Sequence, residues 1–280
     1  MRALVTGGAG FVGTNLVKRL LKEDYEVIVF DNYSTGFREN QIKGARYGDI
    51  DIRKEFINFY EDIDVIFHMA ALPRIKPSFE NPTEVVDVNV NGTANVLEYA
   101  RRNDIPVIYA GSSSVHGGTY KNPYTFTKWQ AEELCKMYEK IYGLDITICR
   151  FYNVYGDYMI NEGSYRTVLS IFLEQYKNNK PLTITGDGEQ RRDFTHVDDI
   201  VDGMIKCFEK KAYGEVFEFG RGKNYSINEL VDMFGSDRIY IDEIPGEARE
   251  TLRRDDYALM ELNWKPKINL DEWLGEQLWE

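Results

Sequence analysis

The chain has 280 residues, enough for one large or two modest domains with a substantial buried core. Its 34 Lys and Arg against 46 Asp and Glu leave a net charge of −12, which disfavours nucleic acid and anionic membrane surfaces as partners. No stretch approaches the roughly 20 apolar residues of a membrane span, and the N-terminus lacks a signal-peptide pattern. We therefore expect a soluble, cytoplasmic protein. The three cysteines are widely spaced, which does not predict a disulfide. The three histidines lack the spacing of metal ligands, so no metal site is predicted.

Short runs rich in β-branched residues alternate with longer segments of helical period, a pattern typical of a parallel sheet built from βαβ units. The runs predict strands at residues 3–6, 26–30, 46–48, 65–68, 107–110 and 146–149. The periodic segments predict helices at residues 11–22, 54–60, 82–101 and 123–142. Residues 1–155 are therefore expected to form a Rossmann-type, doubly wound α/β domain.

The alternation of strand and helix patterns ends after residue 155. A Gly-rich polar loop, a helix, a short strand and a GDG turn follow. Residues 156–195 and 223–280 are therefore predicted to form a smaller α/β lobe that binds the substrate. Residues 196–222 again have the pattern of a helix and a strand, and we expect them to rejoin the first sheet.

A glycine-rich segment, TGGAGFVG at residues 6–13, follows the first predicted strand and opens the first helix. Gly7, Gly10 and Gly13 permit a tight turn, a close approach of backbone N–H groups to a pyrophosphate, and close packing of helix on strand. Asp31 ends the second strand 18 residues beyond Gly13, where an acid binds the adenosine ribose. An acid there repels a 2′-phosphate, so NAD is predicted rather than NADP. Such a turn also occurs without a ligand.

Tyr124 and Lys128 lie four residues apart at the start of a helix that Asn122 and Pro123 are suited to begin. An ammonium and a cationic nicotinamide nearby favour the phenolate, which can then take a proton from a sugar hydroxyl. Ser112 follows strand 107–110 at the edge of the sheet where ligands bind, and is placed to share that hydrogen bond. The Tyr-to-Lys spacing also occurs on ordinary amphipathic helices. The interpretation therefore depends on the glycine-rich loop and on the serine-bearing strand end that precede it.

The chain contains, in order, the segments TGGAGFVG, FDNYSTG, YGDI, HMAA, NVNGTANVLEYAR, SSSVHG, YTFTK, RFYNVYG and QRRDFTHVDD. Together, from Met1 to about Trp273, they resemble the extended short-chain dehydrogenases, and within them the NAD-dependent nucleotide-sugar epimerase/dehydratase family, particularly its UDP-glucose and UDP-GlcNAc 4-epimerases. The resemblance implies Ser112, Tyr124 and Lys128 as catalytic residues, and a homodimer formed through helices 82–101 and 123–142. Besides the three glycines, it implies these contacts to tightly held NAD: Phe11, Val12, Asp31, Asn32, Gly36, Asp49, Ile50, Met69, Ala70, Ala71, Asn89, Lys128 and Tyr152.

The resemblance also implies where a nucleotide sugar binds. The nucleotide diphosphate is expected at Asn153, Thr167, Thr183, Thr185 and Arg192. Ile244 stands where the family often has a phosphate-binding arginine, so Arg249 is expected to substitute for it, with Arg253 as the alternative. Thr251 is expected beside the sugar C2, where a large aromatic residue would exclude an N-acetyl group.

The triplet Ser112-Ser113-Ser114 distinguishes reactions within the family that the chain resembles. Dehydratases carry Thr-Asp-Glu there, and UDP-glucuronate decarboxylases resemble Thr-Ser-Glu. Without a carboxylate, this triplet implies oxidation and re-reduction at C4, which is NAD-dependent 4-epimerisation of UDP-glucose, UDP-galactose and their N-acetylated counterparts. A dehydratase, a reductase, a decarboxylase and a non-catalytic dinucleotide sensor remain as alternatives.

Overall fold

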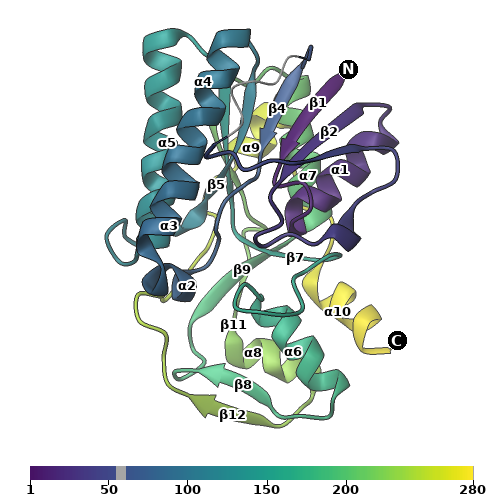
Figure 1. Cartoon of the computed structure of the whole chain (residues 1–280). Coiled ribbons are helices and arrows are strands. Elements are labelled where there is room, and N and C mark those ends of the chain that lie inside the picture. Colours follow the sequence, from purple (N-terminus) through teal and green to yellow (C-terminus); the bar gives the residue numbers. More distant parts are fainter. Residues whose placement is uncertain (55–60, 280) are drawn as a thin grey trace.

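A seven-stranded parallel sheet forms the large lobe, in the strand order β10-β6-β5-β4-β1-β2-β3 (Figure 1). The computed structural model describes residues 1–54 and 61–279, so the helix predicted at 54–60 lies almost entirely outside the described residues. The strands are β1 (Arg2–Thr6), β2 (Glu26–Asp31), β3 (Arg46–Asp49), β4 (Val65–His68), β5 (Val107–Ser112), β6 (Ile146–Phe151) and β10 (Val216–Phe219). The Rossmann-type α/β prediction is confirmed.

Helices cover both faces of this sheet (Figure 1). One face packs against α4 (Thr93–Asn103) and α5 (Pro123–Tyr142), the other against α1 (Phe11–Lys22) and α7 (Val197–Glu209). Alternate residues of a strand enter opposite cores: Leu4 lies in the core beneath α4 and α5, whereas Val5 lies in the core beneath α1 and α7. Burial on both faces explains why these strands are almost continuously apolar.

The predicted helix 82–101 is not a uniform α-helix. It begins as α3 (Pro82–Val86), widens into a π-helical turn over Asp87–Gly92, and continues as α4. The buried Asn89 lies in this turn, where its side chain accepts a hydrogen bond from Leu72 N and donates one to Leu72 O. The turn therefore holds the segment that follows β4.

The second lobe lies beyond the carboxyl ends of the large sheet (Figure 1). It contains the parallel pair β8 (Leu182–Thr185) and β12 (Arg238–Ile241), packed with α6 (Val168–Lys177) and α8 (Ile227–Phe234). A three-stranded sheet also belongs to this part of the chain: β7 (Asn153–Tyr155), β9 (Arg191–His196) and β11 (Asn224–Ser226). The remaining helices are α2 (Ile75–Glu80), α9 (Tyr257–Leu262), α10 (Leu270–Trp279) and two 3₁₀ turns at Arg38–Asn40 and Ser113–Gly117.

In the described part of the chain, none of the helices has the length and apolar character needed to cross a bilayer. The same residues contain no group of three or more His, Cys, Asp or Glu side chains arranged to hold a metal ion. All three cysteines are buried free thiols.

Candidate active site

A cavity of about 850 Å³ opens at the carboxyl ends of the parallel strands and is lined by residues of both lobes. This volume lies near the upper end of the range for ligand pockets, which reach about 1,000 Å³, so the cavity suits a ligand as large as a dinucleotide and part of a second molecule. The last residues of β2, β5 and β6, and the residues directly after β1 and β4, contribute to its wall. This is the edge at which open α/β sheets bind ligands.

The glycine loop joins β1 to α1 at the floor of the cavity. Gly7 has φ +71°, which favours glycine, and a Cβ there would lie 2.7 Å from Ala70 N. A Cβ at Gly13 would overlap the Gly7 carbonyl oxygen, so this position fixes how closely α1 approaches the loop. No side chain caps the N-terminus of α1. Its first-turn N–H groups suit a pyrophosphate.

Asp31 ends β2 beside this loop and lines the cavity. Its carboxylate accepts hydrogen bonds from Ala9 N at 2.9 Å and from Tyr33 N at 2.8 Å. Burial raises the pKa of Asp31, against the effect of these two N–H donors. A fixed acid with remaining acceptor positions fits the ribose hydroxyls of NAD.

Most residues implied as NAD contacts share this cavity. Thirteen of them line it: Gly7, Gly10, Phe11, Val12, Gly13, Asp31, Asn32, Ile50, Met69, Ala70, Ala71, Lys128 and Tyr152. Three do not line it. Gly36 packs on the glycine loop at Ala9, Asp49 is exposed and pairs with Arg38, and Asn89 is buried behind Leu72.

Ser112, Tyr124 and Lys128 meet at the middle of the cavity wall. The Tyr124 hydroxyl donates a hydrogen bond to Ser112 Oγ at 3.3 Å. Lys128 Nζ donates to Tyr109 OH at 2.8 Å and to the Ala110 carbonyl at 2.5 Å. Burial lowers the pKa of Lys128 to about 8, and burial also raises the pKa of Tyr124. The structure therefore places Tyr124 in contact with Ser112 and holds Lys128 at Ala110, two residues before Ser112, and their catalytic roles stay a prediction.

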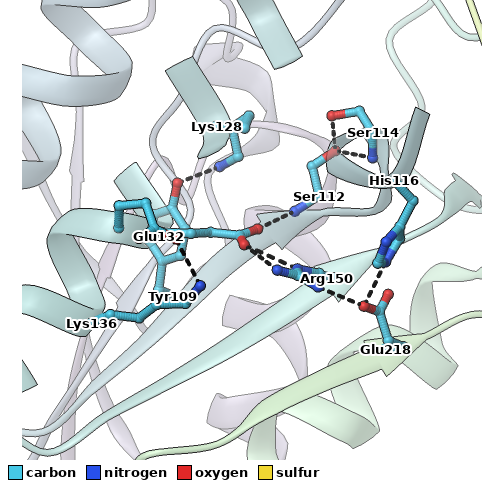
Figure 2. A network of polar contacts seen from close by, with 10 residues as sticks. Tyr109, Ser112, Ser114, His116, Lys128, Glu132, Lys136, Arg150 and Glu218 are labelled. Carbon is cyan, nitrogen blue, oxygen red and sulfur yellow. Dashed lines mark hydrogen bonds and ion pairs between the residues drawn. The ribbon is translucent and has the colours of Figure 1, made fainter. Parts of the chain in front are cut away.

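A buried ionic network supports this wall from behind (Figure 2). Glu132, fully buried one turn after Lys128 on α5, accepts from Ser112 N at 3.4 Å and pairs with Arg150 at 2.7 Å. Arg150 also pairs with Glu218 of β10 at 2.9 Å, and Glu218 pairs with His116 at 2.8 Å. These contacts fix the end of β5 relative to α5, β6 and β10.

The expected substrate residues lie mostly at the second-lobe end of the cavity. Thr251 Oγ1 accepts from Asn153 Nδ2 at 3.0 Å and from Asp193 N at 3.2 Å. Arg192 pairs with Glu247 at 3.1 Å, and burial lowers the pKa of its guanidinium. Six of the seven expected residues line the cavity: Asn153, Thr167, Thr183, Thr185, Arg192 and Thr251.

Arg249 is the expected substrate residue that the structure places elsewhere. Its guanidinium is exposed and pairs with Asp187 at 2.8 and 2.9 Å, away from the cavity. Arg253 does not line the cavity either, because its Nε donates to the Gly220 carbonyl at 2.7 Å. Ile244 does line it, and Arg192 is thus the expected arginine that the structure places at this end.

Sequence reasoning missed several charged residues of the cavity wall: Arg74, Lys76, Lys121, Arg166 and Glu247. Arg74 follows the HMAA segment closely, which was the available signal. Its place in the wall depends on a backbone φ of +113°, which no residue pattern predicts.

Comparison with known proteins agrees with this geometry. The model of the NAD dependent epimerase/dehydratase family matches residues 3–220. A Methanocaldococcus jannaschii protein with the provisional name UDP-glucose 4-epimerase is 36% identical, over 96% of this chain and 94% of its own. UDP-glucuronic acid decarboxylase 1 of Arabidopsis thaliana is 31% identical, over 98% of this chain and 68% of its own.

Solved structures agree as well. The UDP-glucose 4-epimerase of Thermotoga maritima, determined with UDP-glucose, has a TM-score of 0.94 at 29% identity and covers 99% of this chain and 97% of its own. The UDP-glucuronic acid 4-epimerase of Bacillus cereus, in complex with UDP-glucuronic acid and NAD, has a TM-score of 0.92 at 28% identity, over 99% and 98%. The chain belongs to the NAD-dependent epimerase/dehydratase family of nucleotide-sugar enzymes, and its cofactor is NAD.

Proposed function

We propose that the chain is an NAD-dependent 4-epimerase of UDP-hexoses. The observation that carries this proposal is which carboxylates line the cavity. In the described part of the chain they are those of Asp31, Asp51 and Glu247. Asp31 ends β2 on the NAD side, and Glu247 is paired with Arg192. Elimination of water across C5 and C6 needs an additional acid and base beside the tyrosine. The Ser112-Ser113-Ser114 wall offers hydroxyls there instead.

In the proposed reaction Tyr124 is the acid–base group. As a phenolate it takes the proton of the C4 hydroxyl during oxidation, and as a phenol it returns a proton during re-reduction. Ser112, already hydrogen-bonded to that phenol at 3.3 Å, orients both hydroxyls. The Lys128 ammonium, held by Tyr109 and the Ala110 carbonyl, supplies a fixed positive charge that favours the phenolate.

Bound NAD would supply the hydride acceptor and donor for oxidation and re-reduction at C4. In this chain the glycine loop would hold its pyrophosphate and Asp31 its adenosine ribose. Arg192 and the hydroxyls of Thr167, Thr183 and Thr185 would hold the nucleotide diphosphate of the substrate. We further propose a cytoplasmic homodimer.

The test is product analysis with the purified protein. The protein is incubated separately with UDP-glucose, UDP-GlcNAc and their GDP and dTDP counterparts. The products are then separated, and their masses are measured by mass spectrometry. Formation of the C4 epimer, with unchanged mass, is the expected result for the UDP-sugars. A product lighter by one water would identify a dehydratase, and NAD binding without turnover of any sugar would favour the dinucleotide-sensing alternative.

A further inference from the structure

Glu132 is a fully buried carboxylate behind the cavity wall that the proposed mechanism does not use (Figure 2). It lies on α5 one turn after Lys128, so both side chains leave the same face of the helix. Arg150 donates to one of its oxygens, Oε2, from Nε at 3.0 Å and from Nη2 at 2.7 Å. The other oxygen, Oε1, accepts from Ser112 N at 3.4 Å. The ion pair thus leaves one carboxylate oxygen for the residue that bears the reacting serine hydroxyl.

The end of β5 that Glu132 contacts is paired with one neighbouring strand. The ladder of β5 with β4 ends at Tyr109, whereas its ladder with β6 continues to Ser112. Lys128 Nζ donates to the Ala110 carbonyl, and Glu132 accepts from Ser112 N. Two side chains one turn apart on α5 therefore hold the backbone groups on either side of Gly111.

Gly111 shows how closely the carboxylate approaches this strand end. A Cβ at Gly111 would lie 2.9 Å from Glu132 Oε1, so glycine lets the carboxylate reach the backbone. Ser112 Oγ accepts from the Tyr124 hydroxyl at 3.3 Å, and a shift of the strand end would move it out of place. A misplacement of about 1 Å in a reacting group can lower a rate by about 10²-fold.

Glu132 also brings a negative charge close to Lys128. Burial lowers the pKa of Lys128 to about 8, and the charge of Glu132 opposes this fall. The other ionisable groups that interact with Lys128 are Tyr109 of β5, Cys135 of α5 and His68 of β4. All three are neutral near pH 7, because burial raises the pKa of Tyr109 and of Cys135 and lowers the pKa of His68 to about 3. Of these groups, Glu132 is the one that stabilises the ammonium.

We propose that Glu132 is a positioning residue for the reacting groups: it holds Ser112 through the backbone N–H, and its negative charge stabilises the Lys128 ammonium. This inference rests on the proposed 4-epimerisation and names a residue outside the cavity on which that reaction depends. An ion pair with Arg150 that served the fold alone would change the Tm when removed, but not the protonation of Lys128.

The first test uses Glu132→Gln, which removes the charge and keeps the shape of the side chain. Trace acetylation of the full-length protein as purified, quantified at Lys128 by mass spectrometry across a pH series, reports the pKa of this amine, since only its neutral form reacts. We expect this pKa to fall by about one unit or more.

The same variant should move the profile of kcat against pH, measured with a UDP-hexose that the wild type epimerises. The alkaline limb, on which Lys128 loses its proton, should move to lower pH by the same amount. The acid limb should move in the same direction, because the charge of Glu132 adds to burial in raising the pKa of Tyr124. Loss of packing alone would lower the profile without moving it.

Two further variants separate geometry from charge. Glu132→Asp keeps the charge but is too short to reach Arg150 and Ser112 N together. Its kcat should fall by roughly tenfold or more, while the pKa of Lys128 stays within about half a unit of the wild type. Glu132→Gln combined with Arg150→Met removes both charges of the pair and keeps an acceptor for Ser112 N. This double variant should recover at least about half of the lost pKa, because no unpaired guanidinium remains beside Lys128.

Glu133→Gln is the matched control. Glu133 is the next residue on α5, is exposed, and pairs with Lys136 at 2.8 Å, so neither measurement should change. NAD content and Tm are measured on every variant. Loss of the folded state in every Glu132 variant, including the double variant without charges, would make the role structural and overturn the inference.

The remaining outcomes separate this inference from the proposed function. An unchanged pKa of Lys128 in folded Glu132→Gln would overturn the role of the charge. Wild-type kcat in Glu132→Asp would overturn the positioning of Ser112. If the wild type turned over none of the sugars, the proposed function would fail, and acetylation at Lys128 would still decide the role of Glu132.

Discussion

The Tyr124 hydroxyl is the group on which the proposed chemistry depends most directly. Tyr124→Phe removes this hydroxyl and one hydrogen bond to Ser112, so the fold and the NAD content should stay unchanged. We expect kcat to fall by about 10²-fold or more, the usual effect of losing a positioned acid–base group. Ser112→Ala should cost less. Near-normal turnover in Tyr124→Phe, measured with a substrate that the wild type epimerises, would remove Tyr124 from the mechanism.

Thr251 is the residue at which the size of the C2 substituent can be tested. Thr251→Tyr is expected to lower kcat/KM for UDP-GlcNAc relative to UDP-glucose by about 10 to 200-fold, because the larger side chain fills space that the N-acetyl group needs. Thr251→Val is the matched control, since it keeps the volume but loses the contacts from Asn153 and Asp193. If the Tyr and Val variants change the substrate ratio equally, the residue acts through these hydrogen bonds and not through its volume.

Asp31 should matter for cofactor binding more than for stability. Ala9 N and Tyr33 N donate to different oxygens of the Asp31 carboxylate, so Asp31→Asn keeps an acceptor for only one of them and also weakens acceptance from the ribose hydroxyls. We expect the NAD released from the denatured protein to fall well below that of the wild type, and the Tm of the NAD-free protein to fall only by the few degrees that about one lost hydrogen bond costs. Unchanged NAD content would mean that the ribose is held elsewhere.

At the scale of elements, His116 links the short turn after β5 to the edge strand β10 through Glu218. The hydrogen bond to Glu218 raises the pKa of His116 above its usual 6.5. Because the pKa of His116 is higher in the folded than in the unfolded state, its protonated form stabilises the fold. This stabilisation is fully present below about pH 6.5 and is lost as the pH rises through the folded-state pKa. His116→Gln should therefore lower Tm by about 2 °C at pH 6, the scale of a half-exposed pair, and not at pH 9.

Thermal melts of both proteins across this pH range check the prediction. A Tm difference that is the same at pH 6 and pH 9 would show that His116 acts through packing alone. No sequence pattern predicts this pair, because His116 and Glu218 are 102 residues apart and meet only when β10 joins the sheet.

The elements that sequence reasoning predicted well are those specified locally. The bounds of α1 and α5 were predicted without error, since Gly10 and the Asn122-Pro123 pair mark their starts. The helix at 82–101 was predicted without its π-helical turn, whose geometry depends on the contact between Asn89 and the segment after β4. Contacts of this range leave no local pattern.

The same limit applies to the site. Ser112, Tyr124 and Lys128 were predictable because family motifs surround them, and the fold brings them together. Arg74 was missed because its position depends on a strained backbone, and Arg249 was expected in the cavity whereas its guanidinium pairs with Asp187 outside it.

At the scale of the whole molecule, we predict the homodimer that the family resemblance implies, with its interface at α4 and α5. Leu97 and Tyr99 of α4 do not belong to this surface, because they are buried in the core against the sheet. Ile141, which is 65% exposed, and Tyr142 are apolar groups of α5 that do face outward. Light scattering at micromolar concentration should return the dimer mass of about 65 kDa, twice the 32.5 kDa of one chain.

Ile141→Glu is the variant that tests the surface itself. A buried charge on each side of a two-fold interface is unfavourable, so the variant should shift the mass toward the monomer. A monomer mass for the wild-type protein would contradict the dimer, and a dimer unaffected by Ile141→Glu would place the interface elsewhere.

The edge strand β10 and the covering helix α7 both follow the first segment of the second lobe in the chain. During synthesis, therefore, the large sheet lacks its last strand and part of one apolar cover while residues 156–195 are being made. Val5 and Phe67 belong to the core beneath α7. At a synthesis rate of about 5–20 residues per second, they therefore remain without their α7 contacts for several seconds. The order in which the lobes alternate along the chain thus favours slow folding dominated by distant contacts, and makes the nascent protein a natural client for chaperones that bind exposed apolar surface.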